Sequence, residues 1–162
     1  GDILSIDCGA IVDGWHADAA ITVPVGEIDD ESKRLITVTR DSLDAVIAAM
    51  TVGSTLGAIG AAVTGVVEAA GLSIVREYTG HGIGTAMHEE PPVPNYPNGV
   101  GNRMKLKEGL VLAIEPMVNA GKPAVKVLSD GWTAVTKDGS LAAHFEHTVA
   151  VTDAGPVVLT RS

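Results

Sequence analysis

The sequence has few of the features that mark secreted, membrane or nucleic-acid-binding proteins. Its single cysteine, Cys8, cannot form an internal disulfide, which fits a reducing compartment. Only 11 basic residues stand against 20 acidic ones, and the net charge of −9 disfavours contact with phosphate backbones and anionic lipids. No apolar run approaches the roughly 18 residues of a membrane span. We therefore expect a cytoplasmic protein with no direct nucleic-acid partner and no membrane partner.

The composition favours one domain. At 162 residues with 46% apolar content, the chain is long enough for one substantial core and too short for two. We predict a single domain over residues 1–162. The chain starts at Gly1 without an initiator methionine and enters a strand pattern almost at once, which indicates a fragment whose N-terminal part is missing. Cys8 lies in that pattern and is expected to be a buried structural thiol.

Two amphipathic helices are predicted in the first half of the chain. Apolar residues recur at helical spacing over residues 30–50 and again over about 56–70. The expected capping residues are, in chain order, Asp29 or Asp30, Ser54 or Thr55, and Gly71.

Beyond the helices the period of the pattern changes to that of strands. Strands are predicted at residues 74–78, 110–118, 125–128, 132–135, 146–151 and 157–160. The proline-rich segment 91–97 lacks donors for a sheet and is expected to be a stiff surface loop. The order of elements indicates an α+β fold, with one curved, mostly antiparallel sheet covered on one face by the helices.

A hairpin at the start of the chain brings two carboxylates together. Strand patterns at residues 3–12 and 15–23 flank a tight Asp13-Gly14 turn. A two-residue turn places Asp7 opposite Ala20 and makes Asp18 a diagonal neighbour on the same face, about 7–8 Å away at Cα. The pair could hold shared cations, or the two residues could be ordinary exposed positions on a solvated sheet face.

Two histidines follow a predicted strand and are flanked by glycines or glutamates. His81 is flanked by glycines in the segment Gly80-His81-Gly82-Ile83-Gly84, where glycine lets the backbone crowd a ligand and adopt positive φ. His88 follows shortly after and precedes two glutamates and a proline. A lone histidine near a turn is more often structural than catalytic. A functional role for His88 is therefore suggested by its neighbours and not by the histidine alone.

Two glutamates complete a candidate metal-binding set. Glu115 lies inside an apolar segment, where a buried carboxylate is costly unless a cation or donor meets it. Glu146 leads into another apolar strand. With Asp7, Asp18 and His81, these residues give an oxygen-rich set that suits Mn, Fe, Co or Zn in a two-metal site better than structural zinc.

Six segments, in order and with matching spacing, resemble type I methionine aminopeptidases of the peptidase M24 family. They are Ile6-Asp7, Trp15-His16-Ala17-Asp18, Gly80-His81-Gly82-Ile83-Gly84, His88-Glu89-Glu90-Pro91, Ile114-Glu115-Pro116-Met117-Val118-Asn119-Ala120-Gly121 and Glu146-His147-Thr148. The resemblance spans essentially the whole chain and implies the "pita-bread" fold.

The same resemblance implies a dinuclear centre of two divalent metal ions. In the family, the residues at Asp18 and Glu146 bridge both ions, those at His81 and Glu115 complete one site, and that at Asp7 chelates the other. A hydroxide shared by the ions is then the nucleophile.

Further roles follow from the resemblance for residues around the metals. Glu115 is implied as a proton shuttle and His88 as the group that stabilises the substrate carbonyl. Trp132 is similar to a wall of the methionine pocket. Met87 stands where well-known bacterial members carry an aromatic pocket residue, and a thioether can still contact a methionine side chain.

The implied activity is removal of the initiator methionine from nascent proteins. N-terminal methionyl peptides are then the substrates, the ribosome a possible neighbour, and a monomer the expected state at full length. The family's N-terminal portion, which supplies another active-site histidine and much of the methionine pocket, is absent here. This segment alone is therefore expected to be an incomplete enzyme that self-associates.

Two other functions remain open on the sequence. An Xaa-Pro aminopeptidase or prolidase shares the five-ligand set, although Glu146-His147-Thr148 and Trp132 favour the methionine branch. A non-catalytic binding module of the same fold is the second alternative, and the presence of all five ligand residues argues against it.

Overall fold

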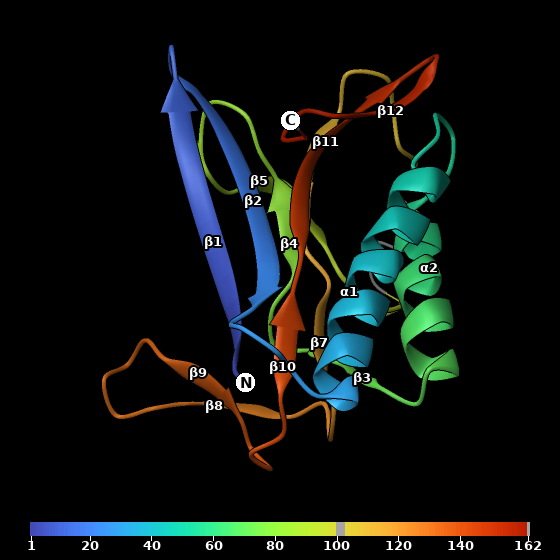
Figure 1. Ribbon diagram of the computed structural model, residues 1–162. Helices are drawn as coiled ribbons and strands as arrows, with labels where there is room; N and C mark the ends of the chain where they lie inside the picture. The colour runs from blue at the N-terminus through green and yellow to red at the C-terminus, as the bar shows by residue number, and fades with distance from the viewer. Residues whose placement is uncertain (100–102, 162) are drawn as a thin grey trace.

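The computed structural model describes residues 1–99 and 103–161 and consists of a curled antiparallel sheet with two helices on one side (Figure 1). The main sheet has seven strands. Its order is β1 (Ile3–Val12), β2 (Trp15–Pro24), β11 (Glu146–Thr152), β6 (Val111–Ile114), β4 (Gly80–Gly82) and β5 (Glu89–Val93), with β12 (Gly155–Val158) paired to β11. The predicted α+β architecture, with its curved, mostly antiparallel sheet, is confirmed.

Two smaller sheets extend the structure below the main one. The first has the order β10 (Ala142–His144), β7 (Met117–Asn119) and β3 (Ser73–Ile74), and the second is the hairpin of β8 (Val125–Val127) and β9 (Ala134–Thr136). In Figure 1 the β8–β9 hairpin projects from the bottom of the molecule, away from the helices.

The first hairpin has the predicted register. Asp13 and Gly14 adopt φ of 50° and 84°, the positive values that a tight turn between twisted strands requires. Asp7 therefore pairs with Ala20, and Asp18 pairs with Gly9 two residues along the same face.

The helices begin and end close to the predicted positions. They are α1 (Asp30–Ala49) and α2 (Leu56–Ala69). Asp29 caps α1 by accepting a hydrogen bond from the Ser32 amide at 2.7 Å, and Thr55 caps α2 by accepting from the Ala58 amide at 3.2 Å. Gly71 has φ of 66° just beyond α2, as expected of a C-terminal capping residue.

The core lies between the helices and the sheet. Leu35 and Val46 of α1 and Ile59 of α2 are fully buried in one apolar cluster with Leu112 of β6 and Val149 of β11. Each such side chain contributes roughly 1.5–3 kcal/mol on burial, so this layer holds the sheet in its curled shape. Within the described residues, neither helix is long and apolar enough to cross a membrane.

The prediction of a stiff surface loop at residues 91–97 was wrong for residues 91–93, whereas residues 94–97 lie outside any helix or strand. Residues Glu89–Val93 form β5 at the edge of the main sheet, and Val93 and Asn95 are buried. The sequence signal misled because proline lacks only the amide proton, and an edge strand is hydrogen-bonded to one neighbour. Pro91 and Pro92 are therefore compatible with pairing to β4 through Gly80↔Val93 and Gly82↔Glu89.

Several predicted strands are shorter or shifted in the structure. The segment 74–78 forms only Ser73–Ile74, and the segment 110–118 divides into β6 and β7 around Glu115 and Pro116. The strands expected at 132–135 and 157–160 are Ala134–Thr136 and Gly155–Val158.

The expectation of a buried Cys8 was also wrong, because this thiol is exposed. Cys8 lies on the face of β1 that points away from the carboxylates, together with Leu4 and Ile6, which are 51% and 46% exposed. An alternating pattern predicts which way a strand side chain points, but the packing of distant elements decides whether that face is covered.

Candidate metal centre

The sheet register aligns three of the predicted carboxylates in one row. Asp7 on β1 pairs with Ala20 on β2, and Ala20 pairs in turn with Glu146 on β11. His147 pairs with Ile114, so the next position along both strands brings Glu115 opposite Glu146. The small side chain of Ala20 leaves the space between Asp7 and Glu146 open.

A second row lies two residues away on the same face. Gly9 pairs with Asp18, and the register of β2 and β11 continues from Asp18 to Thr148. Thr148 pairs with Ala113 on β6, and Ala113 pairs with His81 on β4. The five predicted ligands therefore project from one face of the sheet although they are far apart in sequence.

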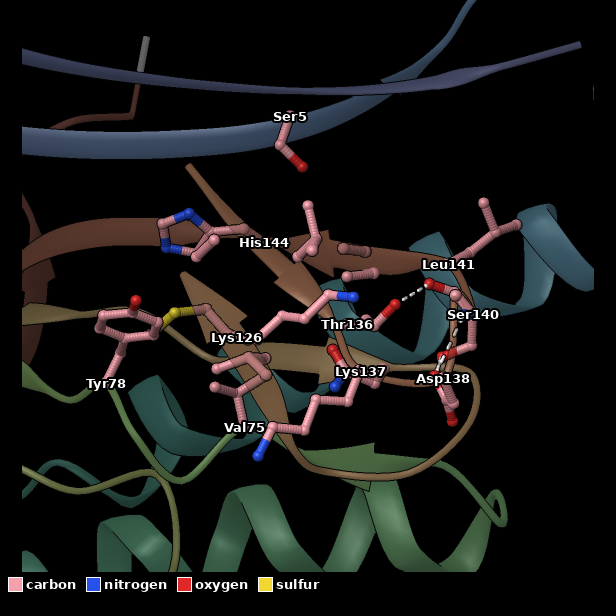
Figure 2. A pocket seen from close by; sticks show the side chains of 18 of the residues that line it. Ser5, Val75, Tyr78, Lys126, Thr136, Lys137, Asp138, Ser140, Leu141 and His144 are labelled. Atoms are coloured by element: carbon pink, nitrogen blue, oxygen red, sulfur yellow. Dashed lines mark hydrogen bonds between the residues drawn. The ribbon is translucent and has the colours of Figure 1, made fainter. Parts of the chain in front are cut away.

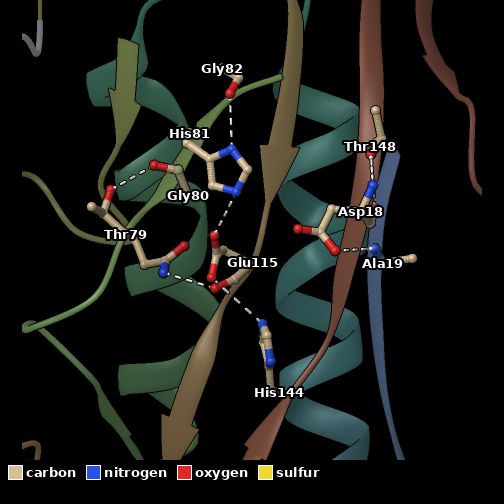
Figure 3. A network of polar contacts seen from close by, with 10 residues as sticks. Asp18, Ala19, Thr79, Gly80, His81, Gly82, Glu115, His144 and Thr148 are labelled. Carbon is tan, nitrogen blue, oxygen red and sulfur yellow. Dashed lines mark hydrogen bonds and ion pairs between the residues drawn. The ribbon is translucent and has the colours of Figure 1, made fainter. Parts of the chain in front are cut away.

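The donor atoms of three of these residues converge. One side-chain donor atom from each of Asp18, His81 and Glu146 lies within 4.8 Å of the others. His81 Nδ1 lies 2.9 Å from the Gly82 carbonyl oxygen, which fixes the proton on Nδ1 and leaves Nε2 free to bind a cation. His81 Nε2 is also 3.6 Å from Glu115 Oε1 (Figure 3).

The metal-free cluster carries carboxyls that resist ionisation. Burial, followed by the charges of Asp7 and Asp18, raises the pKa of Glu115 to about 8. Burial and the charges of Glu115, Asp18 and Asp7 raise the pKa of Glu146 to about 9. The pKa of Asp18 is raised by burial and by Asp7. Gathering this much negative charge is unfavourable unless cations compensate it.

These residues fit divalent metal ions. Glu146 is almost fully buried, yet its Oε1 has no hydrogen-bond partner among the described residues. A buried carboxylate oxygen without a donor is rare in proteins and is satisfied when a cation coordinates it. The donor set of carboxylates and one imidazole suits Mn, Fe, Co or Zn.

A cavity of about 930 Å³ opens beside this cluster and is lined by two of the other predicted site residues, His88 and Trp132. His88 lines it, with its ring centroid 4.4 Å from that of His81. Trp132 lines it from the loop between β8 and β9 and is 89% exposed. Met87 lies elsewhere, with its methyl group over Gly9, so it borders the cluster from the row of Asp18.

The glycines around His81 have a different role from the predicted one. None of Gly80, Gly82 and Gly84 has positive φ. A Cβ on Gly80 would overlap the Ala113 carbonyl oxygen, and one on Gly82 would overlap the Glu90 carbonyl oxygen. The glycines let β4 fit between β5 and β6, and this close approach carries His81 into the cluster.

A second cavity, of about 860 Å³, lies between the β8–β9 hairpin and strands β7 and β10 (Figure 2). Asp138, one of the residues that line it, accepts hydrogen bonds from the Ser140 hydroxyl at 2.7 Å and from the Lys122 amide at 2.7 Å. His144 lines both cavities, whereas none of the five predicted metal ligands lines the second cavity.

The sequence interpretation gave no role to three side chains of the site. His144 Nε2 is buried 3.7 Å from Glu115 Oε2, the buried Asn95 donates to the Glu115 carbonyl oxygen at 3.0 Å, and Thr148 binds the backbone of Asp18. The sequence signal for His144 was its position two residues before Glu146. Thr148 belongs to the segment Glu146-His147-Thr148, but its role and that of Asn95 depend on partners that are distant in the chain.

Comparison with known proteins defines the class to which this site belongs. The family model for metallopeptidase family M24 matches residues 1–153, and the chain belongs to this family. It is 51% identical over 160 residues to a methionine aminopeptidase of Clostridium acetobutylicum and 51% identical over 162 residues to methionine aminopeptidase 1 of Bacillus subtilis. Each alignment covers 99% of this chain and 64% of the relative.

Solved structures show the same fold. The crystal structure of a Thermotoga maritima methionine aminopeptidase matches with a TM-score of 0.96 and 46% identity, over 100% of this chain and 65% of that one. A prolidase of Pyrococcus furiosus has a TM-score of 0.76 at 23% identity, over 100% of this chain and 42% of its own, and shares the fold alone. The expected pita-bread fold is confirmed, and the chain spans about 64% of the length of its relatives.

Proposed function

We propose that this chain carries the metal-binding part of a methionine aminopeptidase, which hydrolyses the N-terminal methionine from nascent proteins. The observation that supports this most directly is the convergence of Asp18, His81 and Glu146 donor atoms within 4.8 Å, beside a cavity lined by His88 and Trp132. The identity of about half the residues to methionine aminopeptidases favours this specificity over that of prolidases.

We propose two divalent ions, held by the five residues of the two rows. Asp18 and Glu146 would be shared between the ions, with His81 and Glu115 on one side and Asp7 on the other. When bound, the ions supply an activated water and a Lewis acid for the peptide carbonyl. The choice among Mn, Fe, Co and Zn is left to metal analysis of the purified protein.

The protein side chains would position the substrate and move its protons. Glu115 would take a proton from the attacking water and deliver it to the leaving amine. His88 would donate a hydrogen bond to the carbonyl oxygen of the scissile peptide. Trp132 and Met87 would contact the methionine side chain, since an indole ring and a thioether both pack well against sulfur.

The wider setting of the reaction is part of the same proposal. Residues 1–162 would belong to a single catalytic domain, monomeric at full length and active in the cytoplasm on chains close to the ribosome. The net charge of −9 disfavours direct contact of this segment with ribosomal RNA.

Release of methionine from Met-Ala-Ser with added Mn²⁺ or Co²⁺ tests the function. The chain is assayed beside a version extended upstream to the length of its relatives, with Ala-Pro as the control substrate. Methionine release that EDTA abolishes supports the proposal. Cleavage of Ala-Pro in its place would assign a prolidase, and metal binding without turnover in either form would assign a binding module.

Two variants separate the proposed roles. His88→Ala is expected to lower kcat by about 10²–10³ through loss of one stabilising donor, with metal binding unchanged. Trp132→Ala is expected to raise KM for Met-Ala-Ser by about tenfold or more with little change in kcat, because it removes binding common to substrate and transition state. Equal kinetics for Trp132→Ala and the unmodified protein would remove Trp132 from the pocket.

A further inference from the structure

Threonine hydroxyls replace part of the backbone pairing at the centre of the metal-binding face. Strands β2 and β11 pair through Glu146↔Ala20 and His147↔Ala19. The same register continues in both directions, to Asp18 opposite Thr148 and to Thr22 opposite His144. At both of these positions a threonine side chain makes the contact, from Thr148 of β11 to Asp18 of β2 and from Thr22 of β2 to His144 of β10.

The Thr148 hydroxyl binds both the backbone amide and the backbone carbonyl of Asp18. Thr148 Oγ1 accepts a hydrogen bond from the Asp18 amide at 2.9 Å and donates to the Asp18 carbonyl oxygen at 2.8 Å (Figure 3). The backbone of Thr148 is already hydrogen-bonded to the segment after β12. Its carbonyl oxygen accepts from the Leu159 amide at 2.9 Å, and its amide donates to the Thr160 hydroxyl at 3.1 Å. The neighbour of β11 changes here from β2 to β12, so the hydroxyl supplies the missing partner for Asp18.

Thr22 makes the mirror arrangement at the other end of the pairing. Its Oγ1 accepts from the His144 amide at 2.9 Å and donates to the His144 carbonyl oxygen at 2.8 Å. Ser5 Oγ lies 2.8 Å from Thr22 Oγ1. Because the single hydroxyl proton of Thr22 goes to His144, Ser5 is the donor in this contact. Both threonines are almost fully buried, so these bonds are shielded from water.

The two threonines contact or flank Asp18, Glu146 and His144. Asp18 is bound by Thr148 itself, and its Oδ1 is oriented by the Ala19 amide at 3.2 Å. Glu146 lies between the Thr148–Asp18 contact and the Thr22–His144 contact, two residues from Thr148 and two from His144. His144 in turn directs Nε2 toward Glu115, at 3.7 Å. A loss of either hydroxyl leaves a buried amide and carbonyl without partners and frees the adjacent strand to move.

We infer that Thr148 and Thr22 are positioning residues for the metal centre, fixing the separation of Asp18 and Glu146 by standing in for main-chain bonds between β2 and its neighbours β11 and β10. The inference rests on the proposed metal site. Partners that hold metal ligands in place typically contribute 10–100-fold to metal affinity, which sets the size of the expected effect. Neither threonine would be a metal ligand, because each hydroxyl is hydrogen-bonded to a backbone amide and a backbone carbonyl.

The test compares Thr148→Val with Thr148→Ser. Valine keeps the shape and loses the hydroxyl, whereas serine keeps the hydroxyl. Titration calorimetry with Mn²⁺ and the visible absorption of bound Co²⁺ report the affinity and geometry of the site apart from any activity. Thr148→Val is expected to bind Mn²⁺ about 10–100-fold more weakly and to change the Co²⁺ spectrum, and Thr148→Ser to stay within about threefold of the unmodified protein.

Thr39→Val is the matched control. Thr39 is fully buried in α1, which carries none of the proposed metal ligands, and its hydroxyl donates to the Leu35 carbonyl oxygen at 2.7 Å. This variant loses the same chemical group and is expected to lower the melting temperature while leaving the Mn²⁺ affinity unchanged. Equal weakening of metal binding by Thr39→Val and Thr148→Val would overturn the inference, since both would then act through general stability.

Thr22→Val provides an independent arm if Thr148→Val fails to fold. It is expected to weaken Mn²⁺ binding by about tenfold. A folded Thr148→Val or Thr22→Val protein with the affinity of the unmodified protein would also overturn the inference. Absence of Mn²⁺ and Co²⁺ binding in the unmodified protein would instead defeat the proposed metal site on which the inference rests.

Discussion

Replacing Glu146 with glutamine is expected to stabilise the metal-free protein while abolishing its response to metal. Glu146 is almost fully buried among Glu115, Asp18 and Asp7, and its pKa is raised from 4.5 to about 9. At neutral pH the folded state therefore keeps this carboxyl protonated, whereas the unfolded chain ionises it. Glutamine is neutral in both states and removes this difference.

The size of the effect follows from the two pKa values. At about pH 7.5, roughly three units above the ordinary value, holding the proton costs about 4 kcal/mol. Coupling with Glu115 and relaxation of the site reduce the expected gain to about 1–3 kcal/mol. For a chain of this length, that is a rise of about 2–10 °C in melting temperature.

The pH dependence of the unfolding free energy independently gives the sign of the Glu146→Gln effect. Because the folded pKa lies above the unfolded one, the contribution of Glu146 to stability is complete below about pH 4.5 and is lost as the pH rises toward about 9. The advantage of Glu146→Gln should therefore be large at pH 8 and should shrink at pH 5.

Thermal unfolding in EDTA at both pH values measures this, with Glu68→Gln as the control. Glu68 is an exposed residue of α2, and its replacement is expected to change the melting temperature little at either pH. Addition of Mn²⁺ should stabilise the unmodified protein and leave Glu146→Gln unchanged. A Glu146→Gln protein that is less stable than the unmodified one in EDTA at pH 8 would refute the reasoning.

Two further predictions concern the backbone packing and the exposed face of the hairpin. Gly82→Ala is expected to destabilise the protein by about 1–3 kcal/mol in urea unfolding, because its Cβ would overlap the Glu90 carbonyl oxygen; Gly65→Ala, in open space on α2, should stabilise by about 0.5–1 kcal/mol. An equal response of the two variants would contradict the packing argument. The 162-residue chain is expected to self-associate in size-exclusion chromatography through the exposed face of β1 and β2, and Ile6→Lys, opposite Ile21, should reduce this; a monodisperse unmodified chain would exclude it.

Local sequence patterns determined the parts of the fold that depend on near neighbours. The Asp13-Gly14 turn set the register of β1 and β2, because a two-residue loop with positive φ permits one alignment. Asp29 and Thr55 cap the helices through hydrogen bonds that span three residues. The apolar stripes predicted which helix faces are buried, because periodicity relates residues within one element.

Patterns that depend on distant neighbours were interpreted less well. The prolines of segment 91–97 indicated a loop, although an edge strand accepts them. Cys8 was expected to be buried, but no local feature tells which face of a strand other elements will cover. The glycines beside His81 were attributed to ligand contact and positive φ, whereas they accommodate the carbonyl oxygens of Ala113 and Glu90.

For the candidate metal site, too, the sequence predicted the residue types and the tertiary structure decided their arrangement. The sequence by itself predicted Asp7, Asp18, His81, Glu115 and Glu146, in part because acidic residues in apolar strands and a histidine between glycines are unusual, and in part because the segments that contain them resemble the M24 family. Only the tertiary structure aligned them in two rows, since that alignment depends on pairings between strands from both ends of the chain. The contact of Thr148 with Asp18 spans 130 positions, and a hydroxyl that replaces a backbone partner becomes visible only when the strands are in place.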